Sequence, residues 1–255
     1  HSNRGLSLFY KLAAPWGGHE GSLLFWSLCL ALWQAVATRR WPGTQRRLRL
    51  LTGVFIALAQ VGLLIFIVTT SDPFLRQFPA PADGRDLNPM LQHPALLCHP
   101  PLLYLGYAGA GFCCALLLAG LFCQPPVNTL AHACRRSLAL SWALRSAGRI
   151  LGSWWAYCER GGGGWWVWDP VENAALLPWL TGAACLHGLD MMRRSGQLVR
   201  TTTLLAVVSV LLTLLGTLVV RSGVLQSVHA FALDEVRALP LFALFIVLSG
   251  SMLLA

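Results

Sequence analysis

The chain has 255 residues, of which 56% are hydrophobic and only 11% are charged, and its formal net charge at pH 7 is +9. Soluble domains carry about 25% charged residues, and here the apolar residues gather into long blocks, so an ordinary soluble domain is excluded. Such blocks match the roughly 20 residues that cross a bilayer as a helix. The composition predicts an all-α, polytopic transmembrane helical bundle.

Seven apolar blocks predict about seven spans within a single helical region, residues 1–255. In chain order they cover residues 21–37, 50–70, 96–123, 138–158, 174–192, 201–220 and 239–255. Pro100 and Pro101 lie near the start of the third block, so we expect a short entry segment there and a helix from about Pro101. The sequence lacks an initiator Met and its last block stops within an apparent helix, so we expect a fragment of a longer chain.

The basic residues predict which way the bundle faces. Arginines concentrate in the loops at 38–49, 124–137 and 193–200, where Asp190 is the only nearby acid. Cytoplasmic loops are rich in Arg and Lys. This rule places the N-terminal stretch and the loops at 71–95, 159–173 and 221–238 on the outer side. It also accounts for the net charge without a nucleic-acid partner.

The loop at 159–173 contains the most unusual stretch, in which four glycines precede Trp165, Trp166 and Trp168. Tryptophans are common at membrane interfaces, but a belt needs only one or two at each helix end. A planar apolar ligand such as haem or a quinone is the alternative, because it would stack on the indoles beside an unobstructed glycine backbone.

The stretch "DPVE" that follows predicts the start of a helix. Asp169 is a suitable N-cap, Pro170 suits the first helical position, and Glu172 completes a capping box. This local structural role explains Asp169 without a ligand.

Three histidines are candidate iron ligands. His99 and His229 both fall on the outer side, where two imidazoles from different loops could coordinate one iron; two unrelated interfacial histidines are the alternative. Pro100 should hold His99 in an extended conformation. His187 lies inside the fifth block, where an ionisable group is a functional candidate. His93, in "LNPMLQHPALLCHPPLLYLGY", could be structural or functional.

Arg145 and Arg149 lie four residues apart on one helical face of the fourth block. Buried cations need acids, carbonyls, water or a ligand carboxylate. Alternatively, the span begins nearer Ile150 and the pair is interfacial.

The eight cysteines form no C-x-x-C, so neither a thioredoxin-type pair nor a covalent c-type haem site is encoded.

Three ordered motifs resemble one family. The stretch "GGGGWWVWDPVENAALLPWL" resembles the tryptophan-rich WWD motif of haem-handling membrane proteins. "GRDLNPMLQHPALLCHPPLLYLGY" and "LLGTLVVRSGVLQSVHAFA" resemble the flanking signatures of the large haem lyase subunit of bacterial cytochrome c maturation. "CERGGGG" and "AFALDEVRA" favour the relative devoted to cytochrome c nitrite reductase.

The resemblance implies a haem lyase subunit in the bacterial inner membrane, with its functional loops in the periplasm. Such a protein holds transient haem at the periplasmic face and presents it to apocytochrome c for thioether formation. Its partners would be apocytochrome c, a periplasmic haem chaperone, other maturation subunits and membrane lipid. Whether this subunit is itself the enzyme of the lyase complex stays open, and no catalytic residue is assigned.

By position in these motifs, His99 and His229 would be axial ligands of the transient haem. Trp165, Trp166, Trp168 and Asp169 would form its platform. His187 would bind a stable b-type haem in the membrane, whose second ligand lies beyond this chain. Their outer-side position makes Arg160, Arg221 and Arg237 candidates to pair with haem propionates.

Two other functions would share part of these features. A b-haem or quinone-linked membrane electron-transfer subunit would share His187 and the aromatic loop, but it would need no outer histidine pair. A haem exporter would be expected to show internal repeats, and no convincing repeat is present.

Overall fold

The structure is a computed structural model that describes residues 2–39, 45–159, 164–166, 168–222, 239–240, 242–247 and 250. The predicted all-α class is confirmed, and no strand occurs among these residues. The helices are α1 (Leu8–Gly17), α2 (His19–Arg39), α3 (Arg46–Thr70), a short 3-10 turn η2 (Pro89–Leu91), α4 (Ala95–Cys123), α5 (Val127–Glu159), α6 (Pro170–Ser195) and α7 (Val199–Ser222).

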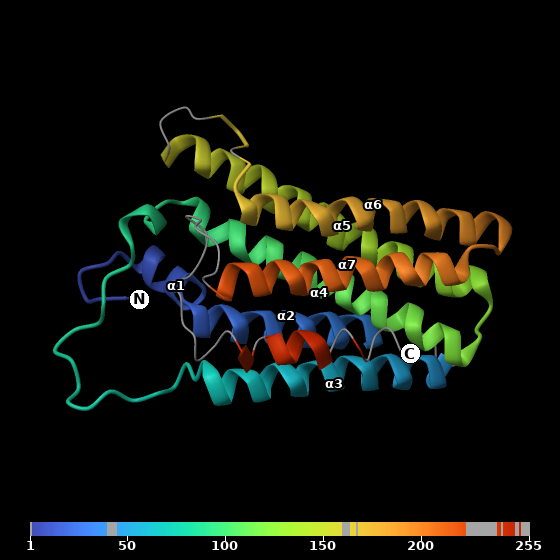
Figure 1. Cartoon of the computed structure of the whole chain (residues 1–255), viewed down its shortest axis with the longest axis horizontal. Helices are drawn as coiled ribbons and strands as arrows, with labels where there is room; N and C mark the ends of the chain where they lie inside the picture. The colour runs from blue at the N-terminus through green and yellow to red at the C-terminus, as the bar shows by residue number, and fades with distance from the viewer. Residues whose placement is uncertain are drawn as a thin grey trace.

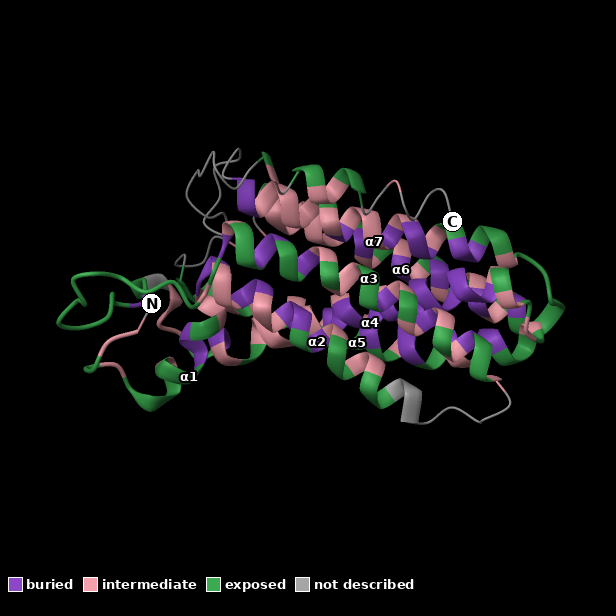
Figure 2. Cartoon of the chain, turned by 90° about the horizontal axis from the view of Figure 1, so that it is seen from below, coloured by how far each residue is buried: buried purple, intermediate pink, exposed green. Residues whose placement is uncertain are grey.

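The long helices form three tiers, with α5 and α6 on one side, α4 and α7 in the middle, and α2 and α3 on the other side (Figure 1). Helix α4 contacts α1, α2, α3, α5 and α7. Its sequence is apolar on every face, as expected of a helix surrounded by others. Gly109 lets Trp33 of α2 approach closely, because a Cβ there would lie 2.6 Å from the indole. The buried residues accordingly follow α4 through the bundle (Figure 2).

Three helices are long and apolar enough to cross a membrane, judged by length and composition within the described residues: α3, α4 and α7. Helices α2, α5 and α6 correspond to three further predicted blocks. They pack against the three candidate spans, but they carry more polar residues than those helices do. Of the seventh block, residues 239–240, 242–247 and 250 are described, and all of them are helical. The membrane-protein class is therefore confirmed, while the number of spans stays approximate.

The predicted start of the third helix at Pro101 is wrong. Helix α4 begins at Ala95, so His99 lies in a helix rather than in an extended segment. Pro100 has no N–H to donate to the carbonyl of Leu96, four residues earlier. The indole Nε1 of Trp16 donates to that carbonyl instead, at 2.8 Å. A contact from α1, which the sequence did not predict, thus satisfies the carbonyl that the proline leaves open.

Helix α5 is longer than the block at 138–158, because it begins at Val127 and includes much of the expected loop at 124–137. This settles the position of Arg145, which lies well inside the helix with no exposed surface. The helix therefore begins well before Ile150, and Arg145 lies in the interior of the bundle.

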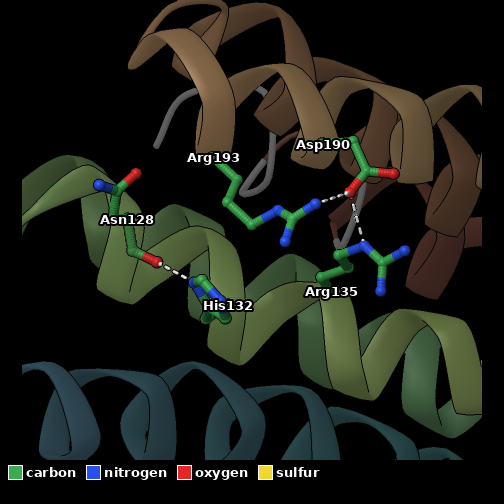
Figure 3. A network of polar contacts seen from close by, with 5 residues as sticks. All are labelled: Asn128, His132, Arg135, Asp190 and Arg193. Carbon is green, nitrogen blue, oxygen red and sulfur yellow. Dashed lines mark hydrogen bonds and ion pairs between the residues drawn. The ribbon is translucent and has the colours of Figure 1, made fainter.

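The two ends of the bundle differ in chemistry. At one end, Asp190 of α6 accepts from Arg135 of α5 at 2.6 Å and lies 3.5 Å from Arg193 (Figure 3). We call this the Asp190 end. The opposite end carries α1, the loop at 71–94 and the first residues of α4 and α6 (Figure 1). We call it the His99 end.

Candidate functional site at the His99 end

The imidazole of His99 lies between α4 and α5. Its Nδ1 is 2.7 Å from the carbonyl oxygen of Gly148. Gly152, one turn further along α5, makes room for the ring, because a Cβ on Gly152 would lie 2.5 Å from Cε1 of His99. Trp155 closes the same face of α5, with its ring 6.0 Å from the imidazole in an edge-on arrangement. Three residues of α5 therefore fix the position of His99.

The bond to Gly148 also determines the tautomer of His99. A carbonyl oxygen can only accept, so Nδ1 must donate the hydrogen. The lone pair of the neutral ring then belongs to Nε2. Histidines that bind metals through Nε2 commonly donate Nδ1–H to a backbone carbonyl in this way. The local geometry therefore fits an iron ligand.

His93 has the opposite arrangement. Its Nδ1 accepts from the backbone N–H of Ala95 at 3.1 Å, so the hydrogen of the neutral ring lies on Nε2. The ring stacks on Trp155 at 6.0 Å and meets the edge of Trp154 at 4.9 Å. Trp155 thus contacts both imidazoles, and His93 acts as part of an aromatic cluster around His99.

The described part of the tryptophan loop forms an exposed aromatic surface before α6. Trp165 stacks on Tyr157 of α5, with the ring centroids 5.5 Å apart, while Trp166 and Trp168 pack edge-to-face at 6.4 Å. Trp165 and Trp168 are exposed. The buried Nε1 of Trp166 has no hydrogen-bond partner among the residues described. Open indole faces and one orphaned donor fit a planar ligand that carries polar groups.

The predicted capping box is confirmed. The carboxylate of Asp169 accepts from the backbone N–H of Val171 at 2.8 Å, and Glu172 accepts from the N–H of Asp169 at 3.4 Å. Trp168 precedes the cap with a φ of 57°, a conformation that non-glycine residues rarely adopt. The side-chain amide of Asn173 donates to its carbonyl. The start of α6 therefore determines where the Trp168 indole lies.

His187 lies deeper, on an exposed face of α6. Leu177, Leu180, Ala184 and Met191 share that face, at intervals of three and four residues. The described residues leave this apolar stripe uncovered. His187 is therefore not brought together with His99, and its face is open to lipid or to another part of the protein.

Arg221, a candidate for a haem propionate, lies in a buried network at the end of α7. Its guanidinium donates to the carbonyl of His19 at 3.0 Å, to Oγ of Ser22 at 2.9 Å and to the hydroxyl of Tyr104 at 3.1 Å. Ser71 at the end of α3 lies 3.3 Å from the His19 ring. These contacts join α2, α3, α4 and α7 in one layer and favour a bracing role for Arg221.

Some predicted residues lie outside the described residues, namely His229, Arg160 and Arg237. Within the described ranges, no group of three or more His, Cys, Asp or Glu could hold a metal ion. An apolar cavity of about 430 Å³ is lined by α2, α3, α4, α7 and the segment at 244–247, and none of the predicted site residues lines it.

Sequence reasoning missed the roles of Gly148, Gly152 and Trp155. The spacing of the two glycines, Gly-x-x-x-Gly in "GRILG", was a usable signal, because small residues four apart mark close helix contacts in membranes. The sequence alone did not indicate that a histidine some 50 residues earlier fills the space that they leave.

Comparison with known proteins shows the family to which the chain belongs. The model of the cytochrome C assembly protein family matches residues 16–226. A probable cytochrome c-type biogenesis protein NrfE of Escherichia coli strain K12 is 53% identical over 249 residues, which are 98% of this chain and 45% of that protein. Cytochrome c-type biogenesis protein CcmF of Haemophilus influenzae is 45% identical over 255 residues, 99% of this chain and 39% of that protein.

A solved structure has the same arrangement of helices. The cytochrome c haem lyase CcmF superposes with a TM-score of 0.76 at 26% identity, over 97% of this chain and 37% of that one. The chain thus spans less than half the length of these relatives.

Proposed function

Because the chain belongs to the cytochrome c assembly protein family, we propose that it is the haem-holding part of a cytochrome c haem lyase. In this proposal it binds transient haem at the His99 end and presents it to apocytochrome c. The observation that supports the proposal is the bond between His99 Nδ1 and the carbonyl of Gly148, which puts the ring hydrogen on Nδ1, so that Nε2 would be the atom that binds iron. His229 is the proposed second axial ligand.

The tryptophan loop is the proposed platform. The exposed faces of Trp165 and Trp168 would pack against the porphyrin, and the buried N–H of Trp166 would donate to a propionate. Asp169 contributes by starting α6, since its carboxylate caps that helix. The loop begins directly after α5, the helix that fixes His99, so ligand and platform share one support.

His187 is the proposed ligand of a second, stable b-type haem within the membrane. Its place on an uncovered apolar face of α6 supports this, because a ligand from outside the described residues would have direct access. The relatives are more than twice as long as this chain, so a matching histidine can come from the remainder of the protein.

The proposed location is the bacterial inner membrane, with the His99 end in the periplasm and the Arg-rich Asp190 end in the cytoplasm. Proposed partners are a periplasmic haem chaperone, apocytochrome c and the other maturation subunits.

Two NrfE proteins are 53% and 47% identical to the chain, against 45% and 44% for two CcmF proteins, which favours the NrfE branch.

The chain's own contribution to the reaction would be orientation. The substrate haem supplies the vinyl groups to which the thiols of apocytochrome c add. Holding these groups beside an incoming thiol makes the encounter effectively unimolecular. The bond to Gly148 and the space beside Gly152 fix one imidazole, and the indoles fix the plane of the bound group. No acid or base of this chain is required for these roles.

Assembly of a reporter cytochrome c tests the proposal. A strain that lacks the full-length protein should lose holo-cytochrome and accumulate haem on the periplasmic chaperone, and the full-length gene should restore assembly. Normal holo-cytochrome without the protein would contradict the proposal, and so would loss of membrane electron transfer with cytochrome assembly intact.

A further inference from the structure

Two buried arginines have no role in the site described so far. Arg145 has no exposed surface. Its Nη1 donates to the carbonyl of Pro178 at 2.9 Å, and the side chain is fitted between Gly106 of α4 and Gly182 of α6. Arg149, one turn along α5, is largely buried and lies over the ring of Trp179 at 5.6 Å. Both cations therefore sit inside the helix bundle.

Most of their guanidinium nitrogens lack a hydrogen-bond partner among the described residues. Nε and Nη2 of Arg145, and all three guanidinium nitrogens of Arg149, are buried and have no hydrogen-bond partner in the part of the chain that the structure describes. No salt bridge there joins either residue to an acid; the described ion pairs lie at Asp190. Two like charges one turn apart, away from water, are costly unless an anion compensates them.

The pair has a defined level in the bundle. Arg149 is the residue after Gly148, whose carbonyl holds His99. Its guanidinium lies over Trp179 of α6, and that indole donates to Ser146, two residues before Gly148 and so further from the His99 end. Arg145 lies beside Gly182, five residues before His187 on α6, which is about 8 Å along the helix. The two guanidinium groups are therefore between the levels of the two proposed haem ligands.

We propose that Arg145 and Arg149 form a buried carboxylate-binding site in the full-length protein. The planar guanidinium fork matches a carboxylate in two-point contact, and the orphaned donors are the ones such a group would satisfy. Two sources can supply it, a haem propionate or an acidic side chain from the part of the protein beyond this chain. The propionate source rests on the proposed function; the site itself does not.

The direction in which Arg149→Gln changes the melting temperature tests the site. In full-length protein, Arg149→Gln should lower the melting temperature, because a carboxylate would lose its cation and stay buried. Without such an anion, the same substitution removes a desolvated charge, and the melting temperature should rise or stay unchanged. Arg136→Gln is the matched control, since Arg136 is on the same helix but exposed, and it should have no effect. Arg149→Lys keeps the charge without the fork and should lower the melting temperature less.

Haem and its dimethyl ester then distinguish the sources. If a propionate occupies the site, haem-free wild type should bind haem at least about tenfold more tightly than the ester, as expected from a charge-assisted hydrogen bond. Arg149→Gln should abolish that preference and lower the melting temperature only in the haem-loaded form.

If a protein acid occupies the site, the melting temperature should fall equally with and without haem, and the ester should bind as well as haem. Both patterns support a carboxylate site. An unchanged or raised melting temperature, together with no preference for haem over the ester, overturns it. Failure of haem to bind at all would count against the proposed function, while the haem-free melting temperature would still test the site.

Discussion

Nδ1 of His99 donates to the carbonyl oxygen of Gly148 at 2.7 Å and ties α4 to α5. The bond has two consequences. It directs the ring by anchoring it to a rigid helix, and it leaves the lone pair on Nε2.

Gly152→Ala should disturb the site without removing a ligand. The new Cβ would lie 2.5 Å from Cε1 of His99, so the ring must move away from α5. We expect weakened binding of the outer haem, measured as loss of its low-spin absorption, while membrane haem bound by His187 is retained. Gly111→Ala is the matched control, because a Cβ there makes only an ordinary contact at 3.6 Å. Equal effects of the two substitutions would show that the space beside His99 is irrelevant.

Two substitutions of Asp169 distinguish a role as a helix cap from a role in which its charge binds the ligand. Asp169→Ala should cost about 1 kcal/mol through loss of the cap. Asp169→Asn should keep most of that stability, because asparagine is an equally good N-cap residue. We expect haem binding to follow stability, with the Asn variant close to wild type in thermal unfolding and haem titration. A strong haem defect in a stable Asn variant would assign the carboxylate a direct role.

The Arg221 network should brace the His99 end. Tyr104→Phe removes one hydrogen bond and should cost about 1 kcal/mol. Arg221→Gln should cost more, about 2–4 kcal/mol, because the His19 carbonyl and two hydroxyl groups lose a charged donor. Denaturant unfolding of the full-length protein in detergent measures both. If the two variants unfold like wild type, Arg221 does not join these helices.

His187 should control a separate haem. His187→Ala in the full-length protein is expected to remove the membrane haem, seen as a lower haem content by pyridine haemochrome, and to leave the outer haem in place. Met191→Ala, on the same face of α6, is the control for packing. Unchanged haem content in the His187 variant would exclude it as a ligand.

Local signals in the sequence predicted part of this structure. The cap at Asp169 needs only four consecutive residues, so its capping box was predictable. The helix at His99 was not, because the carbonyl that Pro100 leaves open is satisfied by Trp16, some 80 residues earlier in the chain. The early start of α5 was also missed, since its first turns carry Arg135 and Arg136 on an exposed polar face.

The candidate site divides in the same way. Residue type and motif singled out His99, His187 and the tryptophans. The spacing of Gly148 and Gly152 signals a close helix contact, but which side chain fills the space beside them depends on how α4 and α5 pack. Whether Arg145 is buried likewise depends on how far α5 extends, and the structure places its side chain in the interior of the bundle.

The most direct test is the absorption spectrum of the full-length protein with His99 replaced by alanine. The account predicts that wild type shows a bis-histidine, low-spin haem at the outer site. His99→Ala should lose this signal together with cytochrome c assembly, and His229→Ala should behave alike. His132→Ala, an exposed histidine at the Asp190 end, should resemble wild type. Intact haem content and intact assembly in both ligand variants would contradict the central claim that His99 holds the transient haem.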